Sequence, residues 1–99
     1  FSADLARGLA TFARVAPGGI WHFANRPHTS WFDVASAMAH ELGAPADFVT
    51  PITTSELSPV PAAQRPAFSA LSTEKWEAAG FAPTPLWRDA LSRFVRDRN

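Results

Sequence analysis

Apolar side chains recur at helical spacing near the start of the chain. Leu5, Leu9 and Phe12 lie at positions i, i+4 and i+7, so they share one face of a helix. Ser2 is a residue type that caps helix N-termini, and the turn Pro17–Gly19 would end the helix. The pattern therefore predicts an amphipathic helix between these boundaries, with its apolar face turned towards a core.

A second helix is predicted more sharply, because both of its ends are marked. Ser30 stands three residues before Asp33, which is the spacing of a capping box, and Gly43 followed by Pro45 would end the helix. The apolar face of this helix consists of Trp31, Val34, Ala35, Met38, Ala39 and Leu42.

The C-terminal third predicts two more helices. Ser72 would cap a short helix over Thr73–Ala79, and Thr84 would cap the last helix with Pro85 at its first position, where proline is tolerated. The apolar face of the last helix consists of Trp87, Ala90, Leu91, Phe94 and Val95.

Two segments have the composition of short strands. Ile20–Ala24 is aromatic and lies between turn signals, and Phe48–Thr53 is a weaker strand that Pro51 confines to a sheet edge. The two strands either pair with each other under the helices or extend a larger sheet outside these residues. The chain from Ser58 to Pro66 reads as a proline-rich loop.

The predicted fold class is thus α+β, with three to four helices and two short strands. Its predicted core consists of Leu5, Leu9, Phe12, Val34, Met38, Leu42, Leu91 and Phe94.

The length and net charge of the chain limit the number of domains and the kinds of partner that it is expected to bind. Ninety-nine residues suit a single domain, 1–99, and nine basic residues balance nine acidic ones. A neutral chain has no electrostatic footprint for nucleic acid or an anionic membrane, so neither partner is expected. Without cysteine or a long apolar run, we expect a soluble cytoplasmic domain. Because the chain begins at Phe1 without an initiator methionine, we expect it to be a piece of a longer protein or a processed product.

Most candidate chemistry has a structural explanation. His22, His28 and His40 fall on a predicted strand, loop and helix without ligand spacing, so no metal site is expected. Ser30 near His28 resembles a nucleophile and base, but the cap explains Ser30 and no elbow glycines flank it. The four tryptophans are interpreted as core, and no glycine-rich phosphate loop is present.

Arg65 is the exception. It stands beside Pro66 in the proline-rich loop, with no carboxylate within several residues to neutralise it. A guanidinium on such a loop suits bidentate recognition of phosphate, and the alternative is an ordinary solvated surface arginine.

The ordered set of motifs resembles the C-terminal half of the dTDP-4-dehydrorhamnose reductase family, over essentially all 99 residues. The motifs are Asp4-Leu-Ala-Arg, Gly19-Ile-Trp-His-Phe, Thr29-Ser-Trp-Phe-Asp, Thr50-Pro-Ile-Thr-Thr, Arg65-Pro66, Ser69-x-Leu71-x-x-x-Lys75 and Pro85-Leu-Trp-Arg-x-Ala-Leu. The sequence departs from the family pattern at Phe68, often asparagine there, at Ser72, often aspartate, and by one extra residue before Arg65.

The resemblance implies an extended short-chain dehydrogenase that reduces the 4-keto group of dTDP-4-dehydro-L-rhamnose. It implies an N-terminal Rossmann domain outside this chain, which binds NADPH or NADH and carries a Tyr-x-x-x-Lys pair. The chain itself, which has no tyrosine, is expected to bind no cofactor, to contribute no catalytic residue and to be inactive alone. Arg65 would bind the diphosphate, with Phe68 and Ser69 as secondary contacts to the nucleotide-sugar.

Three other interpretations stay open at this stage. The chain is alternatively the substrate domain of another nucleotide-sugar epimerase or reductase, or a non-catalytic regulatory module built on the same fold. A third alternative is an independent helical interaction domain, which would show an apolar surface patch unrelated to any cleft. We also expect an apolar surface at Phe1, Trp21 and Phe23 where the Rossmann domain would pack, and self-association as one way to cover it.

Overall fold

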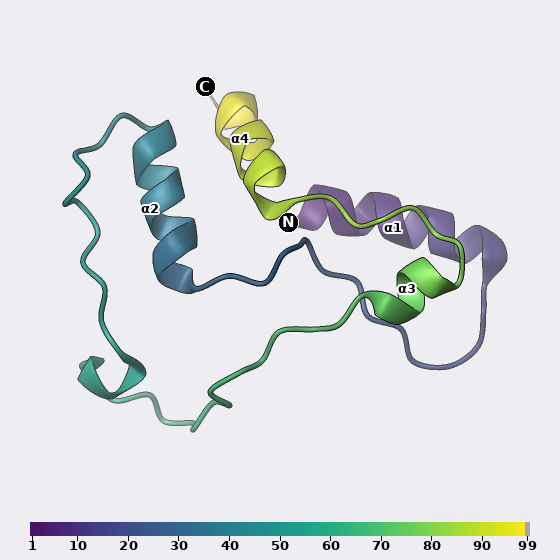
Figure 1. Ribbon diagram of the computed structural model, residues 1–99, viewed down its shortest axis with the longest axis horizontal. Helices are drawn as coiled ribbons and strands as arrows, with labels where there is room; N and C mark the ends of the chain where they lie inside the picture. The colour runs from purple at the N-terminus through teal and green to yellow at the C-terminus, as the bar shows by residue number, and fades with distance from the viewer. Residues whose placement is uncertain (99) are drawn as a thin grey trace. The chain divides into compact units, whose positions relative to one another are not determined.

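The computed structural model describes residues 1–98, which form two compact units. The first, here called the terminal unit, combines Phe1–Thr29 with the chain from Leu71 onward, and the middle unit is Ser30–Ala70. The terminal unit holds α1 (Ser2–Val15), α3 (Glu74–Ala78) and α4 (Trp87–Arg98) (Figure 1). The middle unit holds α2 (Trp31–Glu41) and the single 3-10 turn η1 (Thr54–Glu56).

Helix α1 forms as predicted, but its cap differs. Phe1 occupies the N-cap position and no side chain caps the helix, so the prediction that Ser2 is the cap was wrong. Ser2 is already the first helical residue, and its backbone therefore cannot adopt the extended conformation that an N-cap requires. The helix ends at Ala16, whose left-handed backbone (φ 45°) lets its N–H donate to the carbonyl of Phe12 at 2.8 Å.

Helix α4 begins at Trp87, two residues later than Pro85, so the predicted cap at Thr84 was also wrong. Leu86 instead forms an isolated parallel bridge with Arg26. In this bridge the Arg26 N–H donates to the Pro85 carbonyl at 3.1 Å, and the Trp87 N–H donates to the Arg26 carbonyl at 2.9 Å. The Arg26 carbonyl thus satisfies one of the N–H groups that a helix start leaves unpaired.

The two predicted strands are not confirmed, since within residues 1–98 the only β pairing is that bridge. A strand is defined by the ladder that it shares with a neighbour, and neither Ile20–Ala24 nor Phe48–Thr53 has one. The second segment begins in a turn, closed by the Phe48 N–H and the Pro45 carbonyl at 3.1 Å, and Pro51 has no N–H to donate. The described chain consists of helices and loops.

The capping box of α2 is confirmed. The Asp33 N–H donates to Ser30 Oγ at 3.0 Å, and the Ser30 N–H donates to Asp33 Oδ2 at 3.3 Å. Gly43 follows the helix with a φ of 76°, a left-handed conformation that glycine adopts without strain. Local sequence alone therefore defines both ends of this helix.

The core is smaller than predicted and lies in the terminal unit. Its buried apolar residues are Trp76, Trp87, Ala90, Leu91 and Val95. Of the predicted core, Leu91 is buried, and Phe12, Val34 and Met38 are half-buried. Four predicted core residues are instead exposed, namely Leu5, Leu9, Leu42 and Phe94.

The burial of these four residues was mispredicted for one physical reason. Helical periodicity identifies an apolar face, but it does not show what covers that face. The face of α1 borders an open cavity in the terminal unit, described below. Trp31 is 88% exposed although it lies on the apolar face of α2, so its assignment to the core was wrong. Among the described residues, no helix is long and apolar enough to span a membrane.

Candidate functional site

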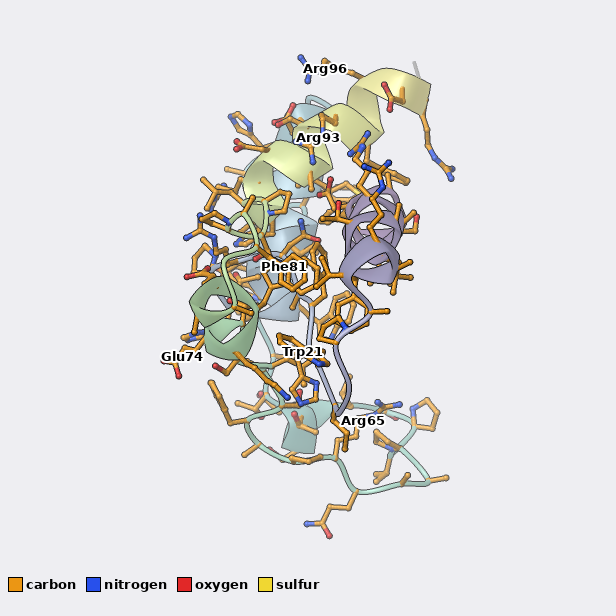
Figure 2. The ribbon with its side chains drawn as sticks, turned by 90° about the vertical axis from the view of Figure 1, so that its right-hand side faces the viewer. Trp21, Arg65, Glu74, Phe81, Arg93 and Arg96 are labelled. Atoms are coloured by element: carbon orange, nitrogen blue, oxygen red, sulfur yellow. The ribbon has the colours of Figure 1, made fainter. Side chains whose placement is uncertain are left out.

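The predicted phosphate-binding residues lie on the loop of the middle unit that follows η1. Arg65, Phe68 and Ser69 are all exposed, and Figure 2 shows Arg65 on this loop. The Arg65 guanidinium makes no hydrogen bond or ion pair with any other residue among 1–98. Its five N–H donors are therefore accessible to an anion, as bidentate recognition of phosphate requires.

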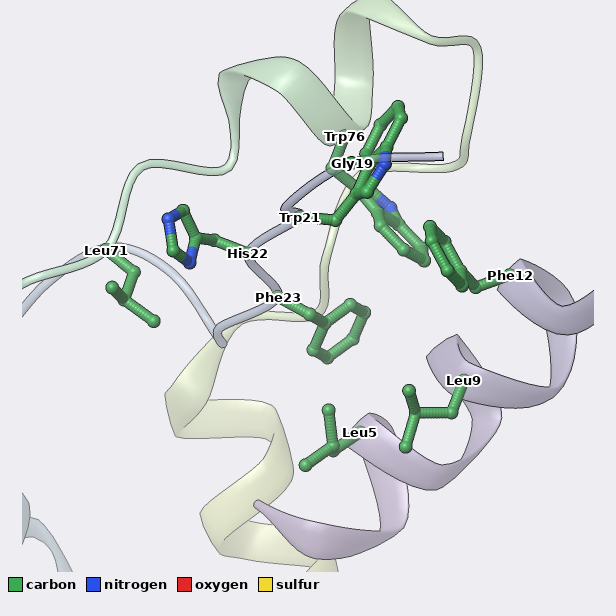
Figure 3. A pocket seen from close by; sticks show the side chains of 9 residues that line it. All are labelled: Leu5, Leu9, Phe12, Gly19, Trp21, His22, Phe23, Leu71 and Trp76. Atoms are coloured by element: carbon green, nitrogen blue, oxygen red, sulfur yellow. The ribbon is translucent and has the colours of Figure 1, made fainter. Parts of the chain in front are cut away.

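The terminal unit contains a cavity of about 430 Å³ with mainly apolar walls. Helix α1 forms one wall and the extended segment at residues 19–23 forms another, as Figure 3 shows. The residues that line it are Leu5, Leu9, Phe12, Gly19, Trp21, His22, Phe23, Leu71 and Trp76.

Stacked and edge-on rings hold the aromatic side of this cavity. The ring centroid of Trp76 lies 4.3 Å from that of Phe81 in a stacked arrangement, and 5.1 Å from that of Phe23, which meets it edge-on. Trp21 meets Phe12 edge-on, with 5.6 Å between the ring centroids. Such pairs contribute about 0.5–1.5 kcal/mol each beyond burial, so the cluster fixes the position of residues 21–23 against α1 and α3.

Both indole N–H groups in this cluster are bonded within the chain. Trp76 Nε1 donates to the Ala82 carbonyl and Trp21 Nε1 to the Gly18 carbonyl, each at 2.9 Å. The Lys75 ammonium lies 4.4 Å from the centroid of the Trp21 ring and donates to the Ile20 carbonyl at 2.8 Å. The polar atoms of Trp21, Lys75 and Trp76 are thus occupied by structural contacts within the chain.

A buried carboxylate organises the other side of the terminal unit. Asp4 is 3% exposed, and both of its oxygens accept from Arg93 Nη2 at 2.8 Å. It also accepts from Arg7 Nη1 at 3.0 Å and from Asn25 Nδ2 at 2.8 Å. The network joins α1, the loop before Pro27 and α4, so its role is to hold the terminal unit together.

No pattern in the sequence predicts this network as a whole. Asp4 and Arg93 are separated by 89 positions, and each alone reads as an ordinary charge in a helix. The signal that was present, the Asp4-Leu-Ala-Arg motif, marks the carboxylate and its exposed partner Arg7 but not Arg93. In the described part of the chain, no group of three histidine, aspartate or glutamate side chains could hold a metal ion.

Comparison of the sequence with known proteins shows which family the chain belongs to. The chain is 38% identical over 97 residues to a dTDP-4-dehydrorhamnose reductase of Streptomyces griseus, a match that covers 93% of this chain and 31% of the relative. It is 38% identical over 93 residues to the dTDP-4-dehydrorhamnose reductase of Mycobacterium tuberculosis, covering 93% of this chain and 30% of the relative. A probable dTDP-4,6-dihydroxy-2-methyloxan-3-one 4-ketoreductase of Streptomyces antibioticus is 35% identical over 100 residues, with 98% of this chain and 32% of the relative covered.

This chain therefore spans about a third of the length of the curated relatives that it matches. No solved structure gives a significant match. The family model described as the RmlD substrate binding domain matches residues 2–99. Since that match covers essentially the whole sequence, the chain belongs to the RmlD substrate binding domain family.

Proposed function

We propose that this chain is the nucleotide-sugar-binding part of a reductase that converts dTDP-4-dehydro-L-rhamnose into dTDP-L-rhamnose. The observation that carries the proposal is the family match over residues 2–99, together with relatives that bear this reductase name. The proposal assigns to this chain the recognition of the substrate, and to the remaining part of the enzyme the hydride transfer.

Within this chain, Arg65 is the residue proposed to bind the diphosphate of the substrate. Its guanidinium is exposed and makes no polar contact with other described residues, and Pro66 restricts the backbone that carries it. A charge-assisted pair to phosphate contributes about 1.5–3 kcal/mol, or roughly 10- to 100-fold in affinity. Ser69 would add a hydroxyl donor, and Phe68, which is 69% exposed, would offer a ring to the sugar or base.

The cofactor and the catalytic pair belong, in this proposal, to an N-terminal Rossmann domain outside these 99 residues. NADPH or NADH would supply the hydride when bound there. The sequence has no tyrosine, so the acid that protonates the 4-keto oxygen in such enzymes has to come from that domain. The contribution of this chain is to bind and orient the nucleotide-sugar beside it.

The test compares three variants of the complete reductase. Arg65→Ala should raise the KM for dTDP-4-dehydro-L-rhamnose by roughly 10- to 100-fold and leave the KM for the nicotinamide cofactor unchanged. Arg65→Lys should recover part of the loss, because an ammonium lacks the forked geometry of a guanidinium.

The matched control is Arg96→Ala, which removes an exposed arginine from α4 and should leave both constants unchanged. If Arg65→Ala leaves the substrate KM unchanged and lowers the melting temperature instead, Arg65 is a structural residue and the assignment is wrong.

A second candidate function is the reduction of a different dTDP-linked keto sugar. The relative from Streptomyces antibioticus favours it, because that protein is named for another 4-keto substrate at a similar identity of 35%. Comparison of kcat/KM for the two dTDP-sugars in the complete reductase distinguishes the candidates: the higher value identifies the substrate.

A further inference from the structure

Lys75 is the only lysine of the sequence, and its side chain joins two segments that lie 55 positions apart. Its ammonium donates to the Ile20 carbonyl at 2.8 Å and lies 4.4 Å from the centroid of the Trp21 ring. The same nitrogen would be 3.6 Å from a Cβ added to Gly19, so it lies close against this stretch of backbone. The hydrogen bond and the cation–π contact together fix both the distance and the direction of the ammonium from the segment.

Helix α3, which carries Lys75, depends on such contacts for its position. The helix has five residues and its N-cap Thr73 makes no side-chain cap hydrogen bond, and isolated helices this short are marginal in water. Trp76 anchors the helix by burial, which is not directional. The hydrogen bond from Lys75 is directional, so it determines how α3 is placed along residues 20–21.

The chain that enters α3 is the end of the loop that carries the proposed substrate-binding residues. Every residue from 50 to 70 is exposed, so burial contributes little to holding this loop in place. Arg65 lies six positions before Leu71, at which the terminal unit resumes. Six residues reach at most about 20 Å, so the place where α3 is fixed limits where the Arg65 side chain can lie.

We propose that Lys75 is a positioning residue for substrate binding, because it fixes the C-terminal anchor of the loop that carries residues 65–69. This inference rests on the proposed function, since it takes that loop to contact the dTDP-sugar. The Lys75 ammonium is engaged with Ile20 and Trp21 of the same chain. Its effect on substrate binding is therefore indirect and passes through the loop.

Steady-state kinetics of three variants of the complete reductase test this role. Lys75→Met keeps the length of the side chain but removes the ammonium. It should raise the KM for dTDP-4-dehydro-L-rhamnose by roughly 3- to 10-fold, while kcat and the KM for the nicotinamide cofactor stay unchanged. Lys75→Arg should restore most of the loss, because a guanidinium still donates and still packs on the indole ring. Glu77→Gln changes an exposed residue of the same helix and is the matched control, with all three constants unchanged.

A readout that needs no substrate keeps this inference separate from the proposed function. Chymotrypsin cleaves after aromatic residues, and Phe68 is 69% exposed on the same loop. Loss of the anchor should speed cleavage after Phe68 by roughly 3- to 10-fold in Lys75→Met but not in Glu77→Gln. If the complete reductase fails to reduce the dTDP-sugar but Lys75→Met speeds this cleavage, the function is refuted and the anchor is retained.

Three outcomes would overturn the inference. The first is an unchanged substrate KM in an active Lys75→Met enzyme, and a lowered melting temperature in that variant would then assign Lys75 to stability alone. The second is an unchanged rate of cleavage after Phe68, because the loop would then be held without Lys75. The third is a rise in substrate KM that Lys75→Arg does not reduce, because the contacts of the ammonium would then not be its cause.

Discussion

Replacing Arg93 by methionine should destabilise the terminal unit far more than replacing Arg7 does. Both arginines bind the same carboxylate, but Arg93 donates to both oxygens of Asp4 at 2.8 Å and its side chain is 36% exposed, whereas Arg7 makes one bond at 3.0 Å and is 70% exposed. The Asp4 side chain itself is 2% exposed. The two variants therefore differ in burial and number of bonds, while the carboxylate that they address is the same.

The expected magnitudes follow from these contacts. Arg93→Met removes charge-assisted hydrogen bonds to a buried carboxylate and should cost about 2–3 kcal/mol, below the full cost of an unpaired buried charge because Asn25 and Arg7 still donate to Asp4. Arg7→Met should cost less than about 1 kcal/mol, as exposed ion pairs do. For a chain of this size, a loss of 2 kcal/mol lowers Tm by about 8–16 °C.

Thermal unfolding followed by tryptophan fluorescence is the assay, because Trp76 and Trp87 are buried in the terminal unit. A double-mutant cycle of Asp4→Asn with Arg93→Met should give a coupling free energy above about 1 kcal/mol. Equal Tm losses in the two arginine variants, or additive effects in the cycle, would show that Arg93 is no more important to the Asp4 carboxylate than Arg7.

Three further predictions concern other positions. Gly8→Ala should lower the free energy of unfolding by about 1 kcal/mol despite the better helix propensity of alanine, because the new Cβ would lie 2.5 Å from Phe23 Cε2. Thermal unfolding should show no such loss for the control Gly18→Ala, because no heavy atom beyond its chain neighbours lies within 4 Å of the new Cβ there. Hydrogen bonds from the Thr53 backbone N–H and hydroxyl lower the pKa of Glu56 below its ordinary value of 4.5. This contact should therefore stabilise the η1 turn above pH 4.5, and the stabilisation should be lost as the pH falls through the lowered pKa. An NMR titration of Glu56 with a midpoint at or above 4.5 would contradict this prediction. The purified 99-residue chain should show no oxidation of NADPH with a 4-keto dTDP-sugar, and spectrophotometric turnover above background would disprove that expectation.

The parts of the fold that were predictable from sequence are those fixed by local chemistry. The capping box of Ser30 and Asp33 and the glycine at position 43 determine α2 without help from distant residues, and both were correctly predicted. The cap of α4 was mispredicted because a tertiary contact decides it. The Arg26 carbonyl meets the N–H of Trp87, and no local pattern around Thr84 reveals a partner 61 positions away.

Burial was harder to predict for a related reason. The apolar period of α1 correctly gives a face that includes Leu5 and Leu9, yet these residues border an open cavity instead of a filled core. The extended segment at residues 20–24 is the same case in a strand: its composition predicts a strand, but the ladder that would define one requires a partner that these residues do not contain. In both cases the sequence indicates an apolar or strand-like segment but does not determine what packs against it.

The loop that carries the proposed substrate-binding residues is held in shape by proline residues, whereas the helices of the terminal unit are held by burial. Every residue from 50 to 70 is exposed, so burial contributes little to holding Arg65 in place. Four prolines, at positions 51, 59, 61 and 66, restrict the backbone there instead, and a stiff chain has less conformational entropy to lose when a ligand orders it. An exposed guanidinium on a stiffened loop has its N–H donors solvated by water before an anion binds. Because the loop is already stiff, binding then costs little conformational entropy. This combination suits a residue whose partner is a phosphate supplied by the substrate, and it is the opposite of the arrangement at Arg93, where the partner is a buried carboxylate of the same chain.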